Sequence, residues 1–163
     1  MAQQQPDLTG RRAGLWDLEE WLRRGQLFAF SAPFTTTALL GALWYFTTYP
    51  NSTGYVEDVI FATDTAIAWT LWFSGGGFAV TGIRGVNLFN GFTPPAGLAM
   101  GAGLLAPPAT SLIIASGFAP AGFYGSILGR IRTLQTGSTA VTLQTAAVAA
   151  NVSATMLVVD ATD

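Results

Sequence analysis

The sequence contains no cysteine, no histidine and no lysine, so all seven of its cations are arginines. Without cysteine there is no disulfide, no thiolate nucleophile and no zinc–thiolate site. Without histidine the chain lacks the usual general base near neutral pH and the commonest ligand of transition metals. We therefore expect no catalytic residue, no cofactor and no metal site, and we predict that the protein is not an enzyme.

Charge of either sign is also scarce. Only 10% of the 163 residues are charged, against roughly 25% in an ordinary soluble domain, while 50% are hydrophobic and the mean hydropathy is +0.43. Such a chain must cover much of its surface, either with lipid or with other protein subunits. The net charge of −2 argues against a nucleic-acid partner, because phosphate binding requires clustered cations. Nothing in the sequence indicates a small-molecule substrate.

Long lipophilic runs are missing as well. Uncharged windows of the length that a transmembrane helix needs lie at 25–49, 65–83, 96–129 and 133–159. Prolines, three consecutive glycines at 75–77, and many Thr, Ser and Gln residues interrupt them. The interruptions favour strands over membrane helices. A multi-pass α-helical membrane protein, serving as a small accessory subunit of a membrane complex, remains the alternative because of the low charge and the many small residues.

The charges that are present gather at the N-terminus. Half of them fall in residues 1–24, whereas residues 85–129 carry none. This contrast predicts a boundary near Gly25, with an arm at 1–25 and a single β-sandwich domain at 26–163.

Within the arm, the stretch LWDLEEWLRRG predicts a short amphipathic helix. Its acids precede its arginines by four residues, the favourable order for ion pairs, and Gly25 suits the position just after a helix. About three turns is marginal for a free helix, so its apolar face should dock on its own domain, on a neighbouring subunit or on a membrane surface. The candidate residues for a partner interface are Leu15, Leu18, Trp21 and Leu22 of this face and Pro94 and Pro95 of a later loop.

The body reads as short strands separated by turn residues, which is typical of a sandwich or barrel. Residues 75–77 are expected to form a turn, and the Gly/Pro-rich segment 90–110 a long surface loop that meets a neighbour. The fold prediction is all-β, a jelly-roll-like β-sandwich with a short N-terminal amphipathic helix. The expected strands are 26–32, 42–49, 55–62, 67–74, 78–89, 111–116, 122–134, 139–147 and 151–160.

Alternation along these strands predicts which side chains share a face. In the third strand, Tyr55, Val59 and Phe61 should share one face, opposite Val56, Ile60 and Ala62. In the eighth, Val141 and Leu143 alternate with polar residues, and in the last, Val152, Ala154, Met156 and Val158 do the same. We expect both Trp69 and Trp72 to pack in the core.

Three carboxylates lie in the body ahead of the C-terminal strand. Glu57 and Asp58 are adjacent, so on a strand they point to opposite faces and do not form an acid–base pair. Asp58 and Asp64 share strand parity and are conceivable oxygen ligands for Ca²⁺, although they follow no recognised loop spacing. We expect them to be solvent-facing carboxylates near the end of a strand.

Three stretches of the body together resemble structural proteins of tailed-virus particles, over about residues 42–160: YVEDVIFATDTAIAWTLWF, LLAPPATSLIIASG and IRTLQTGSTAVTLQTAAVAANVSATMLVVD. They are similar to the jelly-roll or sandwich domains of tail, decoration or collar proteins. The resemblance implies a non-enzymatic virion subunit that self-associates into a ring or trimer and contacts other structural proteins of the particle. Residues 1–25 would then be its anchoring arm. A carbohydrate-binding sandwich that uses exposed Trp and Tyr rings is a further alternative.

Overall fold

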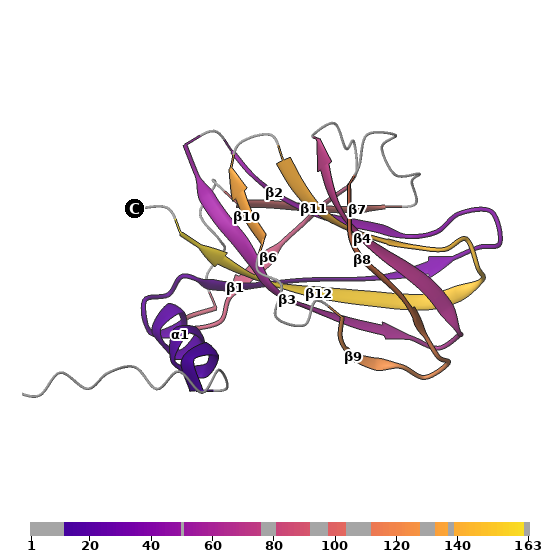
Figure 1. Ribbon diagram of the computed structural model, residues 1–163, viewed down its shortest axis with the longest axis horizontal. Coiled ribbons are helices and arrows are strands. Elements are labelled where there is room, and N and C mark those ends of the chain that lie inside the picture. Colours follow the sequence, from indigo (N-terminus) through magenta and orange to yellow (C-terminus); the bar gives the residue numbers. More distant parts are fainter. Residues whose placement is uncertain are drawn as a thin grey trace, which may run out of the picture.

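The computed structural model describes residues 12–49, 51–75, 81–91, 98–103, 112–127, 133–136 and 139–161. They form one helix, α1 (Arg12–Arg23), and two antiparallel sheets (Figure 1). The all-β prediction is thus confirmed. Within the described ranges, no helix has the length and apolar character that a membrane crossing requires.

The first sheet is built on three long central strands. They are β3 (Thr53–Thr63), β12 (Ala150–Asp160) and β1 (Leu27–Thr36), in that order across the sheet. Short strands form its edges: β9 (Tyr124–Ser126) and β10 (Thr133–Thr136) beside β3, and β6 (Gly85–Asn87) beside β1.

The second sheet has six strands that are hydrogen-bonded in a single path. Its order is β5 (Thr81–Ile83), β7 (Leu98–Gly103), β2 (Leu43–Thr48), β11 (Thr139–Thr145), β4 (Ile67–Gly75) and β8 (Leu112–Ala119).

The connectivity is that of a jelly roll. β1 pairs with β12, β2 with β11, β3 with both β10 and β9, and β4 with β8. The chain therefore forms one long antiparallel hairpin that is wound into two sheets. The turns joining β1 to β2, β3 to β4, β8 to β9 and β11 to β12 gather at one end, opposite α1 (Figure 1). This winding is the jelly-roll arrangement that the sequence predicts.

Strands β5, β6 and β7 belong to an insertion between β4 and β8. β6 pairs with the edge of β1, and β7 pairs with the edge of β2, so the insertion widens both sheets on the same flank. The predicted strand 78–89 therefore corresponds to two short strands in different sheets. The loop expected over 90–110 contains β7, and the strand expected over 122–134 is divided into β9 and β10. Of the turn expected at residues 75–77, only residue 75 is described, as the last residue of β4.

The core fills the space between the sheets. Val141 and Leu143 are buried, as are Val152, Ala154, Met156 and Val158, so the alternation predicted for β11 and β12 is confirmed. Trp44 is its largest fully buried side chain: its ring meets Phe34 and Phe61 edge-on at 5.7 and 6.4 Å, and its indole N–H donates to the Ala32 carbonyl at 3.1 Å.

The predicted faces of β3 are wrong for two residues. The register between β12 and β3 shifts after Leu157, which pairs with Asp58, so that Val158 pairs with Val56 and Glu57 is the extra residue of a β-bulge. The bulge reverses the alternation, so Val56 is fully buried together with Val59 and Phe61, while Tyr55 faces outward.

Of the two tryptophans of β4, only Trp72 differs from the prediction. Trp69 packs against the core cluster, but Trp72 lies on the opposite face of the strand, beside Thr142 and Ile113 of the neighbouring strands. Within the described residues, the indole nitrogen of Trp72 is buried and has no hydrogen-bond partner.

Candidate functional site

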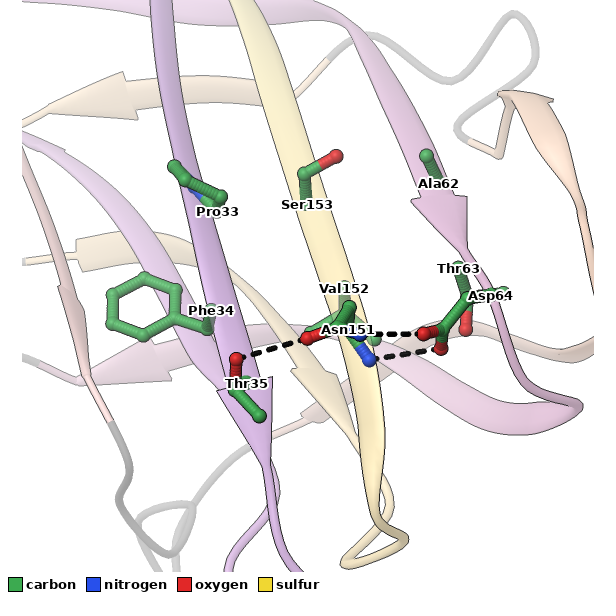
Figure 2. A pocket seen from close by; sticks show the side chains of 9 residues that line it. All are labelled: Pro33, Phe34, Thr35, Ala62, Thr63, Asp64, Asn151, Val152 and Ser153. Carbon is green, nitrogen blue, oxygen red and sulfur yellow. Dashed lines mark hydrogen bonds between the residues drawn. The ribbon is translucent and has the colours of Figure 1, made fainter.

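A depression lies at the end of the sandwich where β1, β12 and β3 run side by side (Figure 2). Its volume is about 510 Å³. Asp64 follows β3 directly, and Asn151 lies near the start of β12, so the topology brings together two residues that are far apart in sequence. The lining consists of Pro33, Phe34, Thr35, Ala62, Thr63, Asp64, Asn151, Val152 and Ser153.

Hydrogen bonds link three polar residues of this depression, Asp64, Asn151 and Thr35, into one chain (Figure 2). The Asp64 carboxylate accepts from the backbone N–H of Asn151 at 2.8 Å and from its side-chain amide at 2.6 Å. The amide oxygen of Asn151 accepts from the Thr35 hydroxyl at 2.9 Å. Thr65 donates its hydroxyl to Asp64 at 3.0 Å. The cluster therefore joins the turn after β3 to the first residues of β12 and the end of β1.

These bonds also set the charge state of Asp64. The backbone N–H of Asn151, followed by its side-chain amide, stabilises the carboxylate and holds the pKa of Asp64 below its ordinary value. Asp64 is therefore a fixed negative charge at neutral pH and not a proton donor.

The arrangement fits a structural role better than a chemical one. Asp58 accepts from the Val59 backbone N–H and from the Ser126 hydroxyl, so Asp58 and Asp64 belong to separate hydrogen-bond networks. In the described part of the chain, no group of three or more His, Cys, Asp or Glu residues lies close enough together to hold a metal ion. We conclude that the hydrogen bonds in this depression hold the turn at Asp64 against the neighbouring strands.

The N-terminal helix ends as its sequence predicts. Gly25 has a positive φ of 68°; its N–H donates to the Leu22 carbonyl at 3.0 Å, and the N–H of Gln26 donates to the Trp21 carbonyl at 2.9 Å. This is a Schellman cap, which requires the left-handed backbone that glycine adopts at least cost. Two exposed ion pairs join Glu19 to Arg23 and Glu20 to Arg24, at 3.8 and 2.7 Å.

The helix lies against the outer face of the first sheet (Figure 1). The rings of Trp21 and Tyr55 meet edge-on, with their centroids 6.1 Å apart. Leu27 and Val159, which pair across β1 and β12, are buried at this end of the sheet. The amide of Asn87 donates to the Gly25 carbonyl at 2.6 Å and holds the point where the arm enters the sandwich.

The predicted interface residues are placed only in part. Trp21 contacts its own domain, and Leu18 and Leu22 are half-buried. Pro94, Pro95 and the side chain of Leu15 lie outside the described residues. Whether any of the six meets a partner stays a prediction.

Sequence reasoning missed that several large apolar side chains of β8 and β9 are exposed; we call these two strands, with the turn that joins them, the β8 flank. These side chains are Leu112, Ile113, Phe118 and Tyr124, whose exposed fractions are 73%, 62%, 67% and 77%. Phe118 and Tyr124 lie on either side of the turn at 120–123, in which Gly122 has a positive φ of 75°. Burial cannot be read from an apolar run without knowing which strand lies at the edge of a sheet.

Comparison with known proteins adds no relative. No family model matches the chain, and no curated protein or solved structure matches it. The geometry of the fold and of its surfaces is therefore the basis for inferring a function.

Proposed function

We propose that the protein is a non-enzymatic structural subunit of a virus particle, which associates with copies of itself into a ring or trimer and with other structural proteins of the particle. The observation that supports this best is the β8 flank, whose large apolar side chains are exposed at an edge of a jelly-roll scaffold. Several large apolar side chains exposed at one edge of a sheet favour an interaction site there, and jelly rolls are an architecture of viral capsid domains.

The chemistry of the chain agrees with this proposal. Sugar-binding lectins and cupins also use jelly rolls, so the fold alone does not favour a virus particle over these classes. The sequence has no histidine to serve as a metal ligand, and the polar groups of the Asp64 depression bond mainly to one another. A subunit held by its surfaces needs neither a nucleophile nor a general base.

The arm supports the same proposal. Its Schellman cap and the bond from Asn87 to Gly25 fix the direction in which the helix leaves the sandwich. We propose that residues 1–25 anchor the subunit to its neighbours in the particle, with the helix held at a defined angle.

Two measurements test the proposal. Sedimentation velocity on the full chain, followed by negative-stain microscopy, should reveal closed oligomers at micromolar concentration. Antibodies against the chain should label tailed-virus particles that encode it in immunogold microscopy. A chain that stays monomeric at about 100 μM, where even weak specific contacts of micromolar affinity are populated, would contradict the proposal, as would particles that lack the chain.

A further inference from the structure

The edges of the two sheets differ sharply in length. At the described edges, β5, β6 and β9 have three residues each and β10 has four, whereas β8 has eight. Natural sheets blunt their edges with short strands, charges or prolines, because an open edge is a template for pairing with another chain. Four of the five edge strands follow that rule through their length.

β8 lacks the other protections as well. Its sequence, LIIASGFA, contains no charged residue and no proline. Within the described residues it pairs only with β4, and a register shift next to Ile114 leaves residues 115–119 as its regular run. Ser116 and Phe118 on this run are exposed. Among the described residues, one bulge is thus its only protective feature, and the run beyond it has no second strand as a partner.

We propose that the edge of β8 pairs antiparallel with β8 of a second copy of this chain, about a two-fold axis at Gly117. The pairing places Ser116 of each copy opposite Phe118 of the other and makes one continuous sheet across both copies. This contact rests on the proposed self-association and adds to a ring contact, because two-fold axes combined with a ring give dihedral symmetry.

The composition of the run favours a second copy over a foreign partner. A two-fold contact brings each residue close to its own image, so a charge near the axis would meet a like charge. β8 carries none, and Gly117, at the axis, has no side chain to hinder close approach. The ring of Trp69 occupies the space on the face of the sheet beside Gly117, since a Cβ built there would lie 2.7 Å from it.

The aromatic residue of the run also fits the two-fold arrangement. Diagonal neighbours in an antiparallel pair lie within reach of long side chains. The two copies of Phe118 become such neighbours, so two exposed rings cover one another across the axis. Burial of exposed apolar area then adds to the new backbone hydrogen bonds.

The test compares charge placed on β8 with the same charge placed elsewhere. Ser116→Arg and Phe118→Arg should each weaken self-association of the full chain by at least about tenfold, because like charges then face each other near the axis. Leu39→Arg is the control, since Leu39 is 87% exposed but lies in the β1–β2 turn. Analytical ultracentrifugation measures the dissociation constants, and circular dichroism verifies that each variant is folded.

A cross-linking experiment tests the register without relying on charged variants. The chain has no cysteine, so Ser116→Cys and Phe118→Cys each introduce a single thiol. Residues directly opposite in an antiparallel pair approach closely enough for a disulfide. An oxidised mixture of the two variants should form the mixed disulfide dimer in higher yield than either variant alone.

The outcomes separate this inference from the proposed function. If both arginine variants associate with the dissociation constant of the wild type, or if no excess of mixed disulfide forms, pairing through β8 is refuted and self-association stands. A wild-type chain that is monomeric at all concentrations overturns both. Weakening by Leu39→Arg as strong as that by Phe118→Arg would also refute a contact specific to β8.

Discussion

Two buried indole N–H groups of this sandwich provide a test of how much hydrogen bonding contributes to its stability. The indole N–H of Trp44 donates to the Ala32 carbonyl at 3.1 Å. That of Trp72 is buried without a partner among the described residues. Replacing either tryptophan with phenylalanine removes the same atoms, but only Trp44→Phe breaks a hydrogen bond of the described structure.

The expected magnitudes follow from that difference. Trp44→Phe loses about 1–2 kcal/mol of ring burial and about 1–3 kcal/mol for leaving the buried carbonyl without its donor. The free energy of unfolding should therefore fall by about 2–5 kcal/mol. Trp72→Phe also loses ring burial, but it removes a buried, unsatisfied donor that costs about 1–3 kcal/mol. Its net effect should be near zero.

Urea denaturation followed by circular dichroism measures both variants at equal protein concentration. At a slope of roughly 1–3 kcal/mol per M, the midpoint of Trp44→Phe should lie about 1 M or more below that of Trp72→Phe. Equal losses in the two variants, or a larger loss for Trp72→Phe, would refute the reasoning.

Three further predictions test other parts of the structure. The pKa of Asp64 is lower in the folded than in the unfolded chain, so its contribution to stability is present above the unfolded pKa of about 3.9 and is lost as the pH falls through the folded pKa. Between pH 7 and acid, the urea midpoint of Asp64→Asn should therefore fall less than that of the wild type. An equal fall in the two proteins would contradict the lowered pKa. Gly41→Ala should strongly destabilise the fold, because its Cβ would lie 2.0 Å from a backbone carbonyl oxygen. A Cβ in Gly82→Ala meets nothing within 4 Å, so this variant should stabilise the fold by about 0.4–1 kcal/mol. A higher melting temperature for Gly41→Ala than for Gly82→Ala would be inconsistent with the packing. Trp21→Ala should make the arm more sensitive to limited proteolysis by removing its aromatic contact, and unchanged cleavage would show that this contact does not hold the helix.

The sequence predicts those elements whose burial or termination is determined by residues close together in the chain. Val141 with Leu143, and Met156 with Val158, alternate with polar residues because one face of each strand is buried, so their strands and faces are predicted correctly. The helix cap at Gly25 is equally local.

Features that depend on a distant strand could not be predicted in this way. The bulge at Glu57 exists only relative to β12, and without it Tyr55 is assigned to the wrong face. β7 reads as a loop because it contains glycines, yet Gly101 pairs with Tyr45, whose ring lies in the space that a side chain at Gly101 would need. Small residues under an aromatic ring are strand-compatible only once the neighbour is known.

The candidate surfaces have the same limit. Asp64 and Asn151 meet only because the winding places the end of β3 beside the start of β12. The β8 flank is apolar in the sequence, but an apolar run does not reveal whether it lies at a covered or an open edge. Those assignments need the topology.

The central place of β12 has a consequence for how the protein is made. β12 lies between β1 and β3, with Leu27 of β1 paired to Val159 of β12, so the first sheet stays split until β12 is synthesised. While the chain is still on the ribosome, the facing edges of β1 and β3 are open, and chaperones have a long interval in which to bind them. Closure of so many contacts between distant segments is also slow, on the millisecond-to-second scale of all-β domains. A C-terminal truncation that reaches into β12 should therefore yield an aggregating chain rather than a smaller domain.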